Sequence, residues 1–178
     1  MNVTTHMSRL LADFTLKHDP DERRGHENLV YQYAVTINFV SIVVLTLIFG
    51  WLTGRLSDTL IAGAAFTVLR VSSGGFHFKS LDLCAIVTAV IYAAIPFIPI
   101  SLSYVPILNV ASVVLVAFLA PTNLRNTAWT DSARAKLTFK IVAIAIVSVN
   151  FAIESPIIAG AFLAQALTLI PRREVKPL

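Results

Sequence analysis

The apolar residues of this chain are gathered into long stretches that contain no charged side chain. Uncharged runs cover residues 35–52, 83–124, 141–153 and 155–171. A helix needs roughly 20 apolar residues to cross the hydrocarbon core of a bilayer, and about 17 still suffice. Because several runs approach or exceed this length, the pattern predicts an all-α integral membrane protein and excludes a soluble fold.

Six membrane-spanning helices are predicted once the breaks in these runs are considered. A cluster of prolines and serines from Pro96 to Pro106 divides the longest run, since proline interrupts a helix. Glu154 to Pro156 separates the last two helices in the same way. The second helix is short, so its ends must rely on snorkelling side chains or stop at the interface. The predicted helices cover about 31–54, 57–73, 82–101, 103–121, 137–153 and 155–171.

The first 28 residues are more polar and contain no apolar signal-peptide core, so we expect this segment to be retained. Met7, Leu10, Leu11 and Phe14 recur at helical spacing, which predicts an amphipathic helix lying on the membrane surface. A frayed polar tail is the alternative. The chain then divides into an interfacial segment at 1–28, a transmembrane domain at 29–171 and a basic tail at 172–178.

Composition agrees with this class, and the distribution of charge adds an orientation. The chain is 56% apolar and 13% charged, with a mean hydropathy of +0.76, too little charge to cover a soluble surface. With six helices, 13 of the 14 Lys and Arg residues fall on one side, and only Arg55 falls on the other. The positive-inside bias predicts a multi-pass protein of the cell membrane with both termini in the cytoplasm.

The candidate chemistry lies in the second predicted connection. Cys84 is the single cysteine, and His77 is the only histidine after residue 26. On a continuous helix these residues would lie about 10.5 Å apart along the axis, whereas a thiol–imidazole pair needs contact at roughly 3 Å. Gly74 and Gly75 offer the break that would let the chain fold back.

A helix start near the cysteine would favour its thiolate form. Ser80 or Asp82 is a suitable N-cap for the third predicted helix, and either leaves Cys84 in the first turn or just beyond it. The helix dipole and a nearby imidazolium would then lower the thiol pKa. Asn123, Asp82 and Ser72 are candidates for a third residue that orients His77.

Structural explanations exist for each of these residues. A lone cysteine is commonly an apolar filler, an interfacial histidine can be simply solvated, and Gly-Gly can be only a tight turn. Arg70 suits a snorkelling helix end. Other chemistries fit less well. There is no His-Glu-x-x-His motif, and one histidine with one cysteine does not complete a metal site. An aspartate pair is also not expected, because Asp58 and Asp82 lie at segment ends on opposite sides of the membrane. Thiol chemistry therefore remains the candidate.

The connection resembles the signature of the accessory gene regulator B (AgrB) family, membrane peptidases of Gram-positive quorum sensing. The shared pattern is an arginine, Gly-Gly, a histidine two residues on and a cysteine seven further. In this chain these are Arg70, Gly74-Gly75, His77 and Cys84. The polar N-terminal segment, the length, the helix count and Ala120-Pro121 before a basic connection extend the resemblance over essentially the whole chain.

The resemblance implies a cysteine endopeptidase that cleaves a short AgrD-like pro-peptide and joins the new carboxyl end to an internal side chain. His77 would take the thiol proton and Cys84 would form a thioester, with Arg70, Gly74 and Gly75 in support. A cysteine or serine of the peptide that reaches the thioester before water would give a cyclic thiolactone or lactone.

The implied partners are a pro-peptide with an amphipathic start and an acidic tail, the lipid bilayer and a second copy of the chain in a homodimer. No cofactor, metal or nucleic acid is expected. Basic side chains near the site would attract the acidic tail, or would only set topology and contact lipid headgroups. These side chains are Lys79, Arg125, Arg134 and Lys136.

Two hypotheses of other classes compete with the peptidase. A small transporter or substrate-capturing subunit would place polar residues near the bilayer midplane. Here the polar residues cluster at the helix ends, with Asn38, Thr67, Ser148 and Asn150 as mild exceptions. A non-catalytic membrane scaffold would make the placement of His77 and Cys84 a coincidence.

Overall fold

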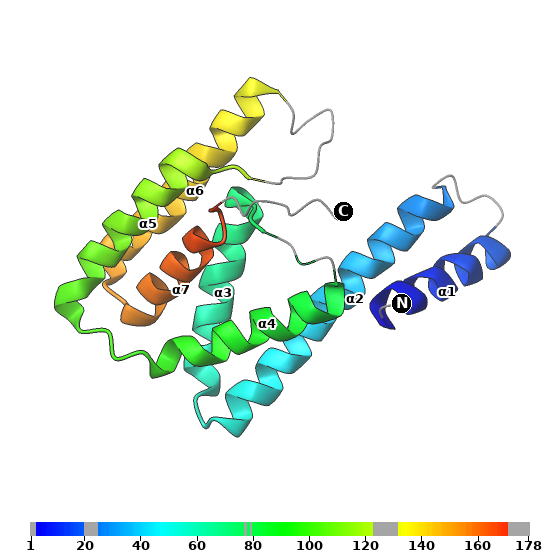
Figure 1. The fold of residues 1–178 in the computed structure, drawn as a ribbon, viewed down its shortest axis with the longest axis horizontal. Coiled ribbons are helices and arrows are strands. Elements are labelled where there is room, and N and C mark those ends of the chain that lie inside the picture. Colours follow the sequence, from blue (N-terminus) through cyan, green and yellow to red (C-terminus); the bar gives the residue numbers. More distant parts are fainter. Residues whose placement is uncertain (1–2, 20–24, 77, 79, 123–131, 171–178) are drawn as a thin grey trace, which may run out of the picture.

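Helices form every regular element in the part of the chain that the structure describes. A computed structural model describes residues 3–19, 25–76, 78, 80–122 and 132–170 (Figure 1). Two short 3-10 turns, Ile95–Phe97 and Leu102–Tyr104, lie in the connection between the helix that ends at Ala94 and the helix that begins at Val105. The α-helices are α1 (Val3–His18), α2 (His26–Leu52), α3 (Leu56–Ser73), α4 (Leu81–Ala94), α5 (Val105–Leu119), α6 (Ala133–Ile153) and α7 (Pro156–Leu167). The all-α prediction is confirmed for these residues.

Each predicted spanning segment coincides with one of the helices α2 to α7, although several ends differ. α2 begins at His26, whereas the predicted span begins at residue 31. The first turns of α2 are polar, so a prediction based on hydropathy does not include them. α4 ends at Ala94 rather than near residue 101, and Pro96 lies in the 3-10 turn that follows. Proline has no N–H for the helical ladder, which explains the early end. α7 ends at Leu167 instead of residue 171.

In the described part of the chain, three helical segments are long and apolar enough to cross a membrane, judged by length and composition. They are His26–Leu52, Leu102–Leu119 and Ala133–Ile153. Leu81–Phe97 and Pro156–Leu167 are apolar but shorter. Large apolar side chains along α2, such as Val40, Val44 and Leu47, are exposed. Such surfaces are compatible with lipid but not with water, so the chain is a membrane protein. Six spans remain a prediction.

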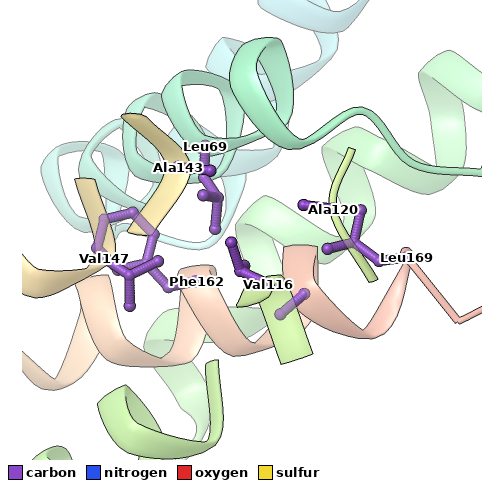
Figure 2. Close-up of a cluster of buried hydrophobic side chains, with 8 residues drawn as sticks. Leu69, Val116, Ala120, Ala143, Val147, Phe162 and Leu169 are labelled. Atoms are coloured by element: carbon purple, nitrogen blue, oxygen red, sulfur yellow. The ribbon is translucent and has the colours of Figure 1, made fainter. Parts of the chain in front are cut away.

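Helix α3 lies at the centre of the arrangement and contacts α2, α4, α6 and α7 (Figure 1). One cluster of buried side chains joins α3 to α5, α6 and α7 through residues such as Leu69, Val116, Val147 and Phe162 (Figure 2). A second cluster joins α3 to α4 and α7 around Phe66. α3 is therefore fixed on several sides, and its carboxyl end has a defined position.

Polar contacts join the helix ends at the face opposite the candidate site. Arg55, before α3, donates to the carbonyl of Pro96 after α4 at 2.6 Å. Fully buried Asn150 of α6 donates to Asn109 Oδ1 of α5 at 3.0 Å. Asn150 also donates to the carbonyl of Ser155 and accepts from its N–H, each at 3.1 Å. These bonds satisfy groups at helix ends, where the helical ladder is incomplete.

The amphipathic N-terminal segment forms α1, which packs on α2 and α4 by its small and polar face. Thr4, Ser8 and Ala12 are buried, whereas the apolar side chains of α1 are exposed. Those exposed side chains are Val3, Met7, Leu10, Leu11 and Phe14. An outward apolar face is what a helix at the membrane interface requires.

Candidate active site

The double glycine ends α3 and turns the chain toward the next helix. Gly74 has φ 73° and ψ −145°, and Gly75 has φ 140°. Side-chain-bearing residues rarely adopt these conformations. A Cβ atom on Gly74 would lie 1.9 Å from the carbonyl oxygen of Thr122, and one on Gly75 would lie 2.6 Å from Thr168 Oγ1. Both positions therefore require glycine for conformation and for space.

The backbone of this turn is held by two distant segments. Gly75 N–H donates to the carbonyl of Thr122 at 2.9 Å, and Thr122 N–H donates to the carbonyl of Ser73 at 3.0 Å. Phe76 N–H donates to the carbonyl of Thr168, just after α7, at 3.0 Å. Because these bonds come from two different elements, residues 73–76 form a fixed base immediately before His77 in the chain.

Gln165 of α7 completes the support of the turn. Its side chain is fully buried, and its Nε2 donates to Ser73 Oγ at 3.1 Å and to the carbonyl of Gly74 at 2.7 Å. Its Oε1 accepts from Arg70 at 3.3 Å and from Thr168 at 3.2 Å. A buried carboxamide with all these partners fixes the turn against the last helix.

Arg70 connects the turn to the end of α3. Its guanidinium donates to the carbonyl of Phe76 at 2.6 Å, in addition to its bond with Gln165, and its Cζ lies 5.9 Å from the ring centroid of Phe66. The side chain is half-buried. Arg70 is thus a structural partner of the glycine turn as well as a positive charge at this end of the bundle.

Cys84 lies at the beginning of α4, as the sequence predicts. Ser80 is the N-cap, and its side chain accepts from Leu83 N–H at 3.3 Å. The N–H of Cys84 donates to the carbonyl of Ser80 at 3.0 Å, which places the cysteine at the end of the first turn. The residue is 5% exposed.

A cavity of about 250 Å³ brings Cys84 and Arg70 to a common space. Phe76 and Phe78 of the connection and Thr168 at the end of α7 also line it. The predicted group is therefore partly assembled: the cysteine, the arginine and the chain beside the glycines border one cavity. His77, Lys79, Asn123 and Arg125 lie outside the described residues, and their predicted roles stay predictions.

The remaining candidates have other surroundings. Asp82, considered as a cap of α4 or an orienting residue, instead accepts from the N–H groups of Val3 and Thr4 at 2.9 and 3.1 Å and from the Thr4 hydroxyl. Its carboxylate thus caps α1. Ser72 Oγ donates to the carbonyl of Leu69 at 3.0 Å. Because His77 lies outside the described residues, the role of Asp82 or Ser72 in orienting it stays a prediction.

Arg134 and Lys136 lie exposed near the start of α6, apart from the lining of the Cys84 cavity. Cations at a helix N-terminus oppose the helix dipole. The predicted surface role of these residues with lipid or peptide stays a prediction.

Sequence reasoning did not identify Gln165, Thr168 or Thr122 as parts of the site. One signal was available, since Gln165 is the only carboxamide residue in the uncharged run from 155 to 171. A strongly polar side chain in an apolar segment is costly unless it has a partner or a function. Nothing local to residues 70–84 indicated where that partner lay.

The fold and the cavity define an integral membrane protein with a guanidinium at the end of α3 and a thiol at the start of α4. Comparison with known proteins gives its family. The sequence matches the family described as Accessory gene regulator B over residues 8–169, and the chain belongs to this family. It is also similar to Protein FsrB of Enterococcus faecalis, with 33% identity over 98 residues. That match covers 50% of this chain and 39% of the length of FsrB. No solved structure matches the chain.

Proposed function

We propose that this chain is a membrane-embedded cysteine endopeptidase that cleaves a short pro-peptide at the cytoplasmic face and contributes to a cyclic signalling peptide. Membership of the accessory gene regulator B family supports the pro-peptide as substrate. The observation that carries the proposal is the common cavity of Cys84 and Arg70, bordered by the fixed turn that precedes His77.

The proposed reaction needs one nucleophile and one base. His77 accepts the thiol proton, and Cys84 Sγ attacks the carbonyl carbon of the scissile bond. The C–N bond breaks, the amine of the carboxyl-side fragment leaves with the proton from His77, and an S–C thioester remains. A cysteine or serine of the peptide then attacks the thioester, which releases Cys84 and closes a thiolactone or lactone ring.

Arg70 has a supporting electrostatic role in this proposal. Its guanidinium borders the cavity that contains Cys84, where a positive charge stabilises both the thiolate and the oxyanion formed during attack. Arg70 also holds the carbonyl of Phe76. Through that bond it joins the electrostatics of the cavity to the position of the turn.

The peptide partner is proposed to approach from the basic face. Arg134 and Lys136 are exposed there, and Lys79 and Arg125 belong to the same predicted cytoplasmic side. Positive surface charge raises the local concentration of an acidic peptide, an effect that salt screens. The acidic tail of the pro-peptide is the segment expected to respond to it.

The proposed orientation has six spans with both termini in the cytoplasm. Reporter fusions after Phe78 and Ser132 should give cytoplasmic signals, because the basic connections resist translocation. Fusions after Gly54 and Ser101 should give external signals. Alkaline phosphatase and green fluorescent protein fusions at each site provide opposite readouts. An external signal after Phe78 or Ser132 would contradict the six-span topology.

A covalent intermediate provides the direct test of function. Membranes that contain the chain are incubated with a synthetic pro-peptide, taken from a short reading frame beside its gene, and quenched in acid. We expect a hydroxylamine-labile peptide adduct that maps to Cys84, because thioesters are cleaved by hydroxylamine and amides resist it. Peptide cleavage that proceeds in the absence of such an adduct would argue for another nucleophile.

Gln165 is expected to act as a positioning residue for the turn before His77. Gln165→Leu removes two donated bonds and two accepted ones, and unsatisfied buried partners cost about 1–3 kcal/mol each. We expect pro-peptide cleavage to fall at least about tenfold in kcat with little change in KM. The pH profile of Cys84 alkylation should also change, because the imidazole would no longer be held beside the thiol.

Asn150→Leu is the matched control for this variant. Asn150 is an equally buried carboxamide with several bonds, but it lies at the opposite face of the bundle. It should lower stability without altering the pH profile per folded molecule. If the Asn150 and Gln165 variants lose activity alike and keep the same pH profile, Gln165 has only a structural role.

A further inference from the structure

A second cavity borders Cys84 from the membrane-spanning part of the fold. It has a volume of about 390 Å³ and lies between α2, α3 and α4. Both cavities are lined by Arg70, Cys84 and Thr88. The cysteine therefore stands where two separate spaces adjoin, one beside the glycine turn and α7, the other along the apolar middle of the helices.

Most of the wall of the second cavity is apolar, and its polar lining residues are Asn38, Thr46, Thr67, Arg70, Thr88 and Tyr92. Val35, Phe39 and Val43 of α2 and Leu60 of α3 supply apolar surface. Asn38 of α2 lies among them, and its Oδ1 is buried without a hydrogen-bond partner among the described residues. An unpaired buried acceptor is unfavourable, so its presence points to a ligand that donates a hydrogen bond.

The chemistry of the lining selects among occupants of this cavity. A lipid acyl chain would fill the apolar surface but has no donor for Asn38. A peptide segment offers apolar side chains together with backbone N–H groups. The volume of the cavity also falls within the range of about 300–1,000 Å³ of ligand pockets. The proposed nucleophile, Cys84, forms part of the cavity wall. A peptide bound in this cavity would have its scissile carbonyl beside the Cys84 sulfur that attacks it.

We propose that this cavity binds the apolar residues of the peptide substrate on the amino side of the cleaved bond, with Asn38 accepting a hydrogen bond from one of their backbone amides. This inference rests on the proposed function. It assigns the acyl part, which stays bonded to Cys84 after cleavage, to the apolar middle of the bundle. There, exclusion of water protects the thioester until ring closure.

The other cavity then receives the carboxyl-side fragment. It is bordered by Phe76, Phe78, Thr168 and Ile170, which lie at or beyond the ends of helices. A fragment that leaves from this side has a short path to the polar face of the molecule. The two cavities thus separate the part of the substrate that is retained from the part that is released.

Two alkylating probes distinguish this assignment from simple access to the thiol. Acetyl-leucyl-phenylalanine chloromethyl ketone carries apolar residues on the amino side of its reactive carbon, and iodoacetamide carries none. In each case the thiolate forms an S–C bond and displaces chloride or iodide. Because Cys84 is the only cysteine, the intact mass of the full-length chain from membranes reports its alkylation.

Val43→Trp and Val44→Trp form a matched pair of variants on α2. Both side chains are exposed, but only Val43 lines the cavity. We expect Val43→Trp to slow the peptidyl probe at least about tenfold, the equivalent of one lost pocket contact, with the iodoacetamide rate unchanged. Val44→Trp should change neither rate. Asn38→Leu should slow the peptidyl probe alone.

Several outcomes would overturn the assignment. A Val43→Trp protein that reacts with the peptidyl probe at the wild-type rate would leave the cavity to lipid or to a second copy of the chain. Equal slowing of both probes would show that the cavity is only a path to the thiol. These results concern the cavity alone, whereas pro-peptide cleavage by a Cys84→Ala protein would reject the peptidase itself.

Discussion

Replacing Cys84 by alanine should abolish pro-peptide cleavage while leaving the amount of protein in the membrane unchanged. The substitution removes a single sulfur atom from a residue that is 5% exposed, and a free cysteine packs as a small hydrophobe. Stability should therefore change little. Loss of the nucleophile should lower the cleavage rate at least about a thousandfold, because no other group replaces a covalent nucleophile. Peptide mass spectrometry and quantitative blotting of membranes measure the two quantities.

Cys84→Ser is the closest control for this experiment. It keeps a nucleophilic atom in nearly the same position, but a hydroxyl is much harder to ionise than a thiol. We expect only trace cleavage. His77→Ala should also prevent the adduct, whereas an imidazole with a purely structural role would tolerate Gln or Asn. Robust cleavage by the Cys84→Ala protein would return the chain to the transporter or scaffold hypotheses.

The positions of the helices were predictable because hydropathy and helix breakers act locally. Each predicted span corresponds to one helix from α2 to α7, and the amphipathic segment corresponds to α1. The ends were less accurate where the pattern carries no local signal. α4 stops at Ala94 because of Pro96, yet apolar residues continue to residue 100 and suggested a longer helix. Within the described residues, three segments meet the length and composition of a span.

The site was predictable only as far as its residues are neighbours in sequence. The Gly-Gly break, the Ser80 cap and the position of Cys84 all follow from residues 74–84. Gln165 and Thr168 support the turn across more than 90 positions of sequence, and no spacing rule predicts such a pairing. Asp82 was predicted as an alternative cap for its own helix, α4, but its carboxylate caps α1 instead.

Gly74→Ala should nearly abolish cleavage through backbone displacement alone. The new Cβ would lie 1.9 Å from the carbonyl oxygen of Thr122, a separation that no rotamer change relieves because both atoms belong to the backbone or are fixed to it. The turn must move away from Thr122 and weaken the Gly75 N–H bond to the same carbonyl. Since a shift of about 1 Å in a reacting group can cost about 100-fold in rate, we expect a loss of that size.

Gly54→Ala separates this clash from the conformational strain of alanine at positive φ. Gly54 has φ 69°, close to the 73° of Gly74, but a Cβ there meets nothing within 4 Å. Both variants thus place alanine at a positive φ, and only one displaces the turn. We expect Gly54→Ala to cleave pro-peptide within about twofold of the wild-type rate, because moderate strain in a distant turn costs stability rather than catalysis. Equal losses in both variants would indicate general destabilisation, and wild-type activity of Gly74→Ala would show that the turn does not position His77 toward Cys84.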